Sequence, residues 1–321
     1  MTLGPIPASD PQFMRRVRVH QAWYRSTVLN LPTYGRLAGS GDPCGSVLPE
    51  EAVSQHLNFV SGAALARYLD RRQGGWGVDP VRCTSYMTSS QTLSFNMLAD
   101  AVSRPNACAA LFRRLLDRDD LAELESSDFE FAAQGSGYGL GDKTLIDVLL
   151  RFRTQRGDLQ VVALETKLAD RFSTRRTGAE TGPGYVKVAT ASRLWKDLAA
   201  SAANNRTRQL TRCHALAQSV QLSDEMHEGG LATIVVITHP ADSSGHRCVD
   251  EYATHVAKGT MIGLSWDQFL DTARATGAID VAAADELGRR YVDLSWSQSA
   301  WAQFEQQESL EMERSARDGA K

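Results

Sequence analysis

The chain has 321 residues, a formal net charge of −3 at pH 7, and 42% hydrophobic residues. This length allows one large domain or two small ones, and the hydrophobic content is sufficient for a packed core. The acidic balance excludes a uniformly basic nucleic-acid-binding surface, so any contact with phosphate has to come from local basic patches.

The cysteines and the N-terminus bear on the compartment. Five cysteines lie far apart and form no C-x-x-C motif. This usage indicates reduced thiols in a cytoplasmic protein rather than a disulfide framework or a zinc knuckle. The N-terminus lacks the apolar stretch of a signal peptide, and the longest aliphatic run, over 231–237, has the length of a strand. We therefore expect a cytoplasmic protein without membrane spans.

The first part of the chain is predicted to be helical. A helix should begin near Asp10 and Pro11, an aspartate cap followed by a proline suited to the first turn. Apolar spacing predicts further helices over 50–72, 89–102 and 106–117. The first helix carries basic side chains that form either a solvated face or contacts to a nucleic-acid backbone: Arg15, Arg16, Arg18, His20 and Arg25.

Residues 144–168 predict a β-hairpin, because two β-prone runs flank a polar turn that contains Gly157. Asp147 and Glu165 both lie nine positions from Arg156, so a hairpin centred there sets the two acids opposite each other. Lys167 shares the face of Glu165, since side chains alternate along a strand.

Two carboxylates beside an amine suit a hard divalent cation and a phosphate, because Mg²⁺ prefers oxygen ligands and an ammonium balances an anionic intermediate. The alternative is that Glu165 and Lys167 form an ordinary exposed cross-strand pair. This is the only E-x-K in the chain, and it lies in an apolar strand where unpaired charges are costly to bury. We therefore interpret it as part of a metal site.

Asp147, a gap of seventeen residues, and then Glu165-Thr166-Lys167 resemble the D-x(n)-E-x-K signature of the PD-(D/E)XK nuclease superfamily, with Ile146 at the position usually held by proline. The segments DFEF (128–131) and SSQTLSFNML (89–98) resemble a bacterial, restriction-endonuclease-like branch of it. The resemblance implies an α/β fold: a mixed central sheet flanked by helices, with an αβββαβ core. We expect a helical elaboration over 1–85, the nuclease core over 86–280, and a helical, charged C-terminus over 281–321.

The resemblance also implies roles for the hairpin residues. Asp147, Glu165 and the main-chain carbonyl of Thr166 would bind Mg²⁺ or Mn²⁺, and Lys167 would orient the attacking water and stabilise the charge that forms on phosphorus. Glu130, in the strand predicted over 128–131, would either add a third carboxylate or face solvent.

Three further side chains are candidates for supporting the site or binding substrate. Gln91 either donates a supporting hydrogen bond or points to solvent. Gln209 and Arg212 fall at i and i+3 of a helix predicted over 206–220, and they either face the scissile phosphate or form ordinary helix-surface polarity.

Two loops flank the hairpin. The glycine-rich stretch 135–142 fails the spacing of a P-loop and is followed by a strand rather than a Rossmann helix, so a nucleotide-binding loop is disfavoured. Residues 169–187 are rich in arginine and form either a disordered loop or a flap that contacts phosphate.

Helices over 191–202, 206–220 and 265–276 and a buried strand over 231–238 complete a parallel crossover. The sequence thus predicts a Mg²⁺-dependent endonuclease, with DNA as the favoured substrate. Defence or restriction is one biological role that such an enzyme could serve. The alternative is a non-catalytic nuclease-fold module for binding or assembly. A homodimer that cuts both strands is expected only from the resemblance to the family, since no residue pattern in this sequence indicates dimerisation.

Overall fold

The computed structural model describes residues 2–132, 140–141, 143–223 and 230–318. A five-stranded mixed sheet forms its centre, in the order β1-β2-β3-β4-β5. β1, β2 and β3 pair antiparallel, and β4 and β5 continue the sheet in parallel with β3. The strands are β1 (Leu121–Ala132), β2 (Leu145–Thr154), β3 (Leu159–Thr166), β4 (Thr233–Thr238) and β5 (Met261–Ser265).

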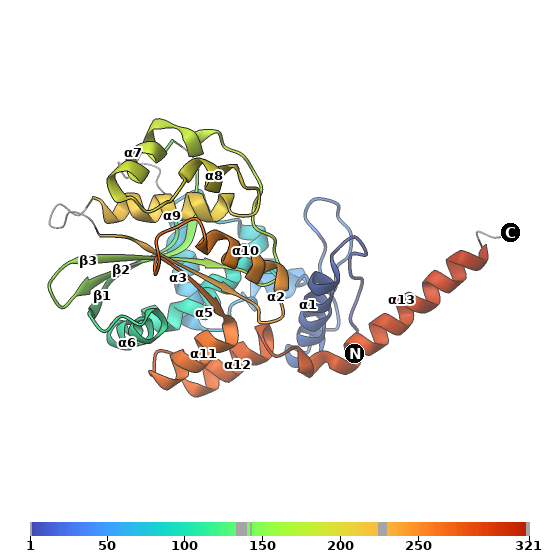
Figure 1. The fold of residues 1–321 in the computed structure, drawn as a ribbon. Coiled ribbons are helices and arrows are strands. Elements are labelled where there is room, and N and C mark those ends of the chain that lie inside the picture. The colour runs from blue at the N-terminus through green and yellow to red at the C-terminus, as the bar shows by residue number, and fades with distance from the viewer. Residues whose placement is uncertain (1, 133–139, 142, 224–229, 319–321) are drawn as a thin grey trace.

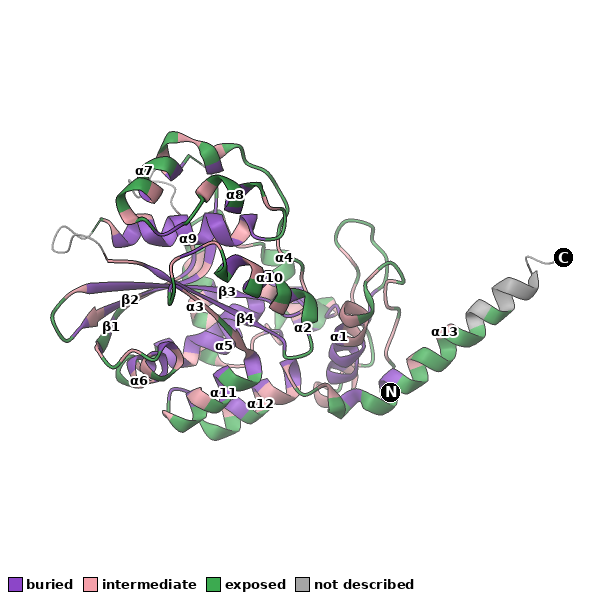
Figure 2. Ribbon diagram, in the orientation of Figure 1, coloured by how far each residue is buried: buried purple, intermediate pink, exposed green. Residues whose placement is uncertain are grey.

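Helices cover both faces of the sheet, so the layers run helix, sheet, helix (Figure 1). One face packs on α3 (Gly62–Gln73), α5 (Ser90–Val102), α6 (Pro105–Leu116), α11 (Trp266–Ala275) and α12 (Val281–Tyr291). The other packs on α7 (Pro183–Ser192), α9 (Arg208–Gln221) and α10 (Ser243–Ala253), with α8 (Leu198–Ala203) and the short η2 (Ala179–Thr181) beside them. In Figure 2 α9 is largely buried over the sheet, whereas α7 and α8 are mostly exposed.

The order α5, β1, β2, β3, α9, β4 is the αβββαβ core expected from the sequence, and the α/β class with a mixed sheet is confirmed. Strand alternation explains the two layers: Val148 and Leu150 of β2 face the α5 side, whereas Leu149 faces α9. No helix within the described ranges is long and apolar enough to cross a membrane.

The N-terminal and C-terminal segments meet in a third apolar cluster beside the sheet. The N-terminal part is formed by α1 (Gln12–Trp23), η1 (Tyr24–Val28) and α2 (Glu50–Ser54). The neighbouring α4 (Pro80–Ser85) instead places Cys83 in the cluster on the α5 side of the sheet. The C-terminal part is η3 (Leu294–Ser297) and α13 (Gln298–Asp318), which packs against α1 at its start and then projects away from the body (Figure 1). The division of the chain at residues 85 and 280 remains a proposal, and the main core cluster draws side chains from all three segments.

Several elements differ from the sequence prediction. The helix expected over 50–72 is two helices, because His56 adopts a left-handed φ of 56° and Ser61 caps a new start at α3. The helix expected over 191–202 is interrupted in the same way, with Arg193 at φ 55° ending α7 and Asp197 capping α8. The short β5 was not predicted. The glycine-rich stretch 135–142 lies outside the described residues except for Leu140 and Gly141.

Candidate active site

The hairpin register brings the two predicted acids to the same end of the sheet. Val148 pairs with Leu164, so the next position outward sets Asp147 against Glu165, as the symmetry about Arg156 predicts. The turn is local in origin: Gly157 takes a φ of 87°, and the Thr154 hydroxyl accepts a hydrogen bond from the Asp158 main-chain N–H at 3.1 Å.

Glu165 is buried and held by three side chains. The Lys167 ammonium lies 2.6 Å from Oε1, and the Gln209 amide donates to the same oxygen at 2.5 Å. The Cys213 thiol, one helical turn beyond Gln209 on α9, points at Oε2 at 3.5 Å. Burial, and then the charge of Glu165, raise the pKa of this thiol, so it stays protonated and donates. Glu165 is therefore oriented from both sheet and helix.

Asp147 is oriented by the residue that follows Glu165. Its Oδ2 accepts the Thr166 main-chain N–H at 2.7 Å and the Thr166 hydroxyl at 2.9 Å. Burial, and then the negative charge of Glu165, raise the pKa of Asp147 to about 7, while Lys167 and the Thr166 hydrogen bonds act in the opposite direction. The carboxyl group therefore lies close to the midpoint of titration at neutral pH.

Glu130 occupies a break in β1. Phe129 packs in the cluster on the α5 side, but Phe131 packs against the cluster on the α9 side, so the alternation of faces fails between them. Glu130 itself adopts a φ of 48°, a conformation that non-glycine residues rarely take and that clusters at functional sites. Arg71 of α3 donates from Nε to the carbonyl oxygens of Phe129 and Glu130 at 3.0 and 3.1 Å. This irregularity turns the Glu130 side chain inward.

The Glu130 carboxyl group is 2% exposed, and its Oε1 has no hydrogen-bond partner. Burial, followed by the charge of Asp147, raises its pKa well above the ordinary value, and Glu165 adds to the effect. A buried polar atom without a partner is rare in folded proteins and calls for an explanation such as an ion or a bound group. Three acids thus influence one another at the end of β1, β2 and β3.

Lys167 is the positive counterpart of these acids. Burial lowers its pKa, but Glu165 and Asp147 together outweigh that effect, so the net pKa lies above its usual value and the side chain stays charged. Its main chain is fixed at both ends, because its N–H donates to the Ile237 carbonyl at 2.9 Å and its carbonyl accepts the Trp266 indole N–H at 3.0 Å. The ring centroid of Phe172 lies 5.3 Å from Nζ.

The donor set fits a hard divalent cation. Mg²⁺ is commonly bound through one or two carboxylates, with waters and substrate phosphate completing its shell. Asp147 and Glu165 supply two carboxylates, and the unpartnered Oε1 of Glu130 is a third oxygen close by. Among the described residues, no three Asp, Glu, His or Cys side chains are grouped to hold a metal ion by themselves, so substrate and water oxygens would be needed.

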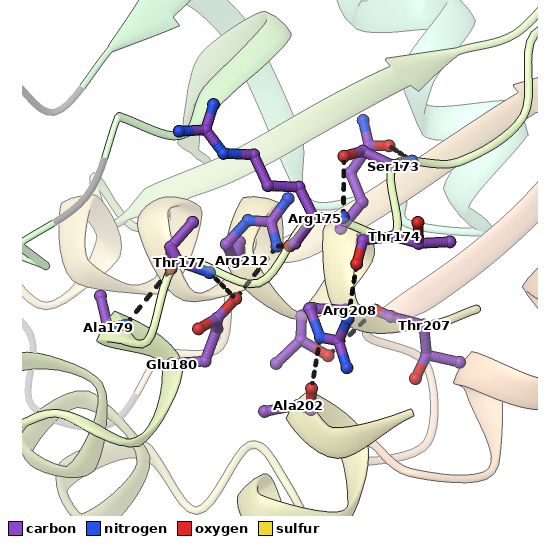
Figure 3. A network of polar contacts seen from close by, with 12 residues as sticks. Ser173, Thr174, Arg175, Thr177, Ala179, Glu180, Ala202, Thr207, Arg208 and Arg212 are labelled. Atoms are coloured by element: carbon purple, nitrogen blue, oxygen red, sulfur yellow. Dashed lines mark hydrogen bonds and ion pairs between the residues drawn. The ribbon is translucent and has the colours of Figure 1, made fainter. Parts of the chain in front are cut away.

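The segment after Lys167 follows a defined path along α9, with three consecutive residues held through their main chain (Figure 3). Gln209 accepts the Ser173 N–H at 2.6 Å. Arg208 donates to the Thr174 carbonyl at 2.6 Å, and Arg212 donates to the Arg175 carbonyl at 2.8 Å. The main chain, not the arginine side chains of the segment, is anchored here.

Arg212 and Gln91, two predicted substrate-binding residues, are placed differently from Gln209. Arg212 is buried and pairs with Glu180 at 3.1 Å, in addition to the Arg175 carbonyl (Figure 3). Its hydrogen-bond and ion-pair partners among the described residues do not include Glu165. Gln91 donates to the Gly77 carbonyl at 2.9 Å and accepts the Asp79 N–H at 3.1 Å, while its amide favours the charged form of Glu130. Their substrate-binding roles remain predictions.

Sequence reasoning missed two residues that shape the site. Cys213 lies four positions after Gln209, and that helical spacing could have placed it beside Glu165. Arg71 gives no signal of its own, since it lies in a helix 59 positions away from Glu130 and acts on main-chain carbonyls.

Comparison with known proteins agrees with this geometry. The family described as the PD-(D/E)XK nuclease superfamily matches residues 8–293. No curated protein and no solved structure matches the chain. Members of this superfamily are generally nucleases and typically use divalent metals. Since the match covers most of the chain and includes the hairpin with its Asp147, Glu165 and Lys167, the chain belongs to the PD-(D/E)XK nuclease superfamily.

Proposed function

We propose that this protein is a metal-dependent nuclease that hydrolyses phosphodiester bonds in DNA, in the manner of an endonuclease. The observation that carries the proposal is that Asp147 and Glu165 lie opposite each other on β2 and β3 beside Lys167, with the buried Glu130 of β1 near enough for the charges of the two acids to raise its pKa. The acids outnumber the ammonium three to one, so ionising all three would leave an excess of buried negative charge, which is why the pKa values of Glu130 and Asp147 are raised. Such an arrangement is costly unless a cation joins it, because burial disfavours every uncompensated charge.

Asp147, Glu165 and the main-chain carbonyl of Thr166 would hold Mg²⁺ or Mn²⁺, with Glu130 as a further oxygen donor. When bound, the metal polarises the phosphate and lowers the pKa of a water molecule. Thr166 keeps Asp147 in place through two hydrogen bonds, and Gln209 and Cys213 keep Glu165 in place. Rigid positioning of this kind lets the acids act without rearrangement during the reaction.

Lys167 supplies the positive charge for the reaction itself. It is held by Glu165 at 2.6 Å, and its pKa is displaced upward. A fixed ammonium next to the scissile phosphate stabilises the additional negative charge that develops on the phosphoryl oxygens in the transition state, and it orients the attacking water. The dry surroundings strengthen this interaction relative to water.

A second candidate function is a binding or assembly module that retains the fold without chemistry. One observation favours it: Oε1 of Glu165 already accepts hydrogen bonds from Lys167 and Gln209, and Oδ2 of Asp147 already accepts two from Thr166. In such a module the two carboxylates would keep these hydrogen bonds permanently and would not bind a metal.

The test is to incubate the purified protein with plasmid DNA, single-stranded DNA and RNA, each with Mg²⁺, Mn²⁺ or EDTA, and to analyse the products. The proposal expects cleavage of DNA with either metal and none with EDTA. Cleavage that persists in EDTA, or no cleavage of any substrate with either metal, contradicts it. Cleavage of RNA alone contradicts the assignment to DNA.

A further inference from the structure

A pocket of about 380 Å³ opens beside the candidate active site. Its walls come from four parts of the chain: the segment directly after Lys167, the turn between α8 and α9, the beginning of α10, and the beginning of α1. The volume lies in the range of small-molecule sites in proteins. None of the residues proposed for the metal site lines it, so it is a separate cavity.

The pocket adjoins Lys167. Phe172 lines the pocket, and the centroid of its ring lies 5.3 Å from the Lys167 ammonium. Asp170, in the same wall, helps to raise the pKa of Lys167. Cys248 of α10 also lines the pocket, and the charge of Lys167 lowers the pKa of its thiol while that of Glu165 raises it. A ligand in the pocket would therefore lie beside the proposed catalytic lysine.

Positive charge dominates the polar part of the lining. Three arginines line the pocket, Arg171, Arg206 and Arg247, against two acids, Asp170 and Asp242. The Asp242 carboxylate is used to cap α10, where it accepts the main-chain N–H groups of Ser244 and Gly245 at 3.1 and 3.0 Å. Arg206 lies 3.4 Å from Glu251. Arg171 and Arg247 have no hydrogen-bond or ion-pair partner among the described residues, so both guanidinium groups are available to an anion.

The remaining lining is apolar and partly aromatic. Phe13 and Met14 of α1 contribute one side and Phe172 another, and all three are half-buried. An inorganic anion needs no such surface, whereas a nucleobase does, because bases stack on aromatic side chains and pack on apolar ones. Guanidinium groups together with an aromatic wall are the complement of a nucleotide, which joins a phosphate to a flat ring.

We propose that this pocket binds one nucleotide of the substrate strand, adjacent to the bond that is cut, with its phosphate on Arg171 and Arg247 and its base against Phe13, Met14 and Phe172. This inference rests on the proposed nuclease function and adds a substrate class to it. A base inside a pocket of this kind is out of the stack and unpaired. The enzyme therefore acts on DNA with unpaired nucleotides beside the cleavage point.

The path of the segment after Lys167 supports this role. Its main chain is anchored on α9 at Ser173, Thr174 and Arg175, so the wall that carries Arg171 and Phe172 is held at both ends, by β3 and by α9 (Figure 3). A preformed wall binds a small ligand without the entropic cost of ordering a loop.

The test measures binding of dAMP, deoxyadenosine and inorganic phosphate to the full chain in EDTA by calorimetry. The parent protein should bind dAMP at least about tenfold more tightly than either fragment, because only dAMP uses both walls. Arg171→Gln and Arg247→Gln should each weaken dAMP binding at least about tenfold. Arg114→Gln is the matched control, since Arg114 is an exposed arginine on α6 without a partner in the described part of the chain, and it should leave the affinity unchanged.

Any of three outcomes would contradict the assignment of the pocket as a nucleotide site. They are no dAMP binding by the parent protein, equal affinity of the parent for dAMP and inorganic phosphate, and equal affinity of the parent and both pocket variants for dAMP. Because EDTA removes the metal, the result does not depend on cleavage. If the parent protein binds dAMP but cleaves no DNA, the proposed nuclease function is wrong and the nucleotide pocket stands. If the parent protein cleaves DNA but does not bind dAMP, the nuclease function stands and the nucleotide pocket is wrong.

Discussion

Two regions of this protein bury charged side chains, and they do so in opposite ways. In the N-terminal region the Arg25 side chain is fully buried, and within the described part of the chain its hydrogen bonds all go to neutral carbonyl groups, among them those of Gly45 at 2.9 Å, Thr33 at 2.6 Å and Thr2 at 2.5 Å. At the end of the hairpin, Glu130, Asp147 and Glu165 are crowded together, and burial with mutual repulsion raises the pKa of Glu130 and Asp147.

The difference teaches what each buried charge is for. Arg25 ties three separate stretches of chain to one helix, so its charge serves the fold. The charges of the acid cluster are not needed to link chain segments, because neutral side chains could make the same contacts. Repulsion between these like charges destabilises the folded protein. A cluster that lowers stability without linking segments is expected where function requires it.

The basic residues of the first helix extend the comparison. The sequence left open whether they form a solvated face or contact nucleic acid. In the structure Arg15 pairs with Glu308 of α13 at 2.5 Å, Arg16 donates to the Ser297 hydroxyl at 2.7 Å, and Arg18 pairs with Asp10 at 2.5 Å. These side chains are committed to the protein itself, unlike Arg171 and Arg247.

The largest effect should come from removing catalytic charge. Glu165→Gln and Lys167→Ala should each reduce the DNA cleavage rate at least about ten-thousandfold, or more than about 5 kcal/mol, because each removes a fixed charge from the transition state. Rates are measured with Mg²⁺ on plasmid DNA. Glu123→Gln, an exposed acid of β1, and Lys258→Ala, an exposed lysine between α10 and β5, are the matched controls and should cut like the parent. Full activity in either site variant would break the assignment.

Removing the structural charge should give the next largest effect, but on stability. Arg25→Met should lower the free energy of unfolding by about 4 kcal/mol, because several buried carbonyls lose their donor. Urea unfolding measures this loss, with the exposed Arg114→Met as a control that changes little. Cleavage per folded molecule should be unaffected. A variant as stable as the parent would show that Arg25 does not tie the segments together.

Neutralising one acid of the site should act in the opposite direction. In EDTA near pH 8, Asp147→Asn should raise the free energy of unfolding by about 3 kcal/mol, because a buried negative charge next to Glu165 and Glu130 is removed while the Thr166 hydrogen bonds can be retained. The same urea titrations measure the gain. If the variant is instead less stable than the parent, the acids do not repel each other in the folded state.

A smaller, pH-dependent effect is expected at His20. Burial, opposed by the Arg289 carbonyl and joined by the charges of Arg16 and His239, lowers the pKa of this histidine from 6.5 to about 4. Above 6.5 the imidazole is neutral in both states. As the pH falls toward 4 the unfolded chain takes up the proton first, so stability is lost.

His20→Gln has no such group to titrate. The stability that this variant loses relative to the parent should therefore shrink by about 2 kcal/mol between roughly pH 7.5 and pH 4.5. Urea unfolding at both pH values provides the measurement. A difference that is independent of pH would show that His20 is protonated alike in the folded and unfolded chain.

The sequence predicts the frame of the site better than its details. The register of Asp147 and Glu165 followed from distances to one turn, because strand alternation around a short turn is a local periodicity. Gln209 was expected either at the scissile phosphate or on the helix surface; in the structure it donates to Glu165, and its contact with phosphate remains a prediction. The conformation of Glu130 could not be predicted in this way, since strand alternation sets its face and Arg71, far away in sequence, overrides it. The same holds for Arg212, whose partner Glu180 lies in an arginine-rich segment without a periodic pattern.

The pocket likewise depends on long-range packing. Its walls include α1, the segment after β3, and α10, which are distant in sequence. No local sequence pattern predicts that these segments pack together. Tertiary structure alone brings Phe13 to the same cavity as Arg247.

The most direct test of the central claim is a calorimetric titration of Mn²⁺ and Mg²⁺ into the parent protein and into Asp147→Asn and Glu165→Gln. If the acids are crowded in order to hold a cation, the parent should bind the metal and each variant should bind it at least about tenfold more weakly. Absence of binding by the parent, or equal binding by all three proteins, would contradict the account.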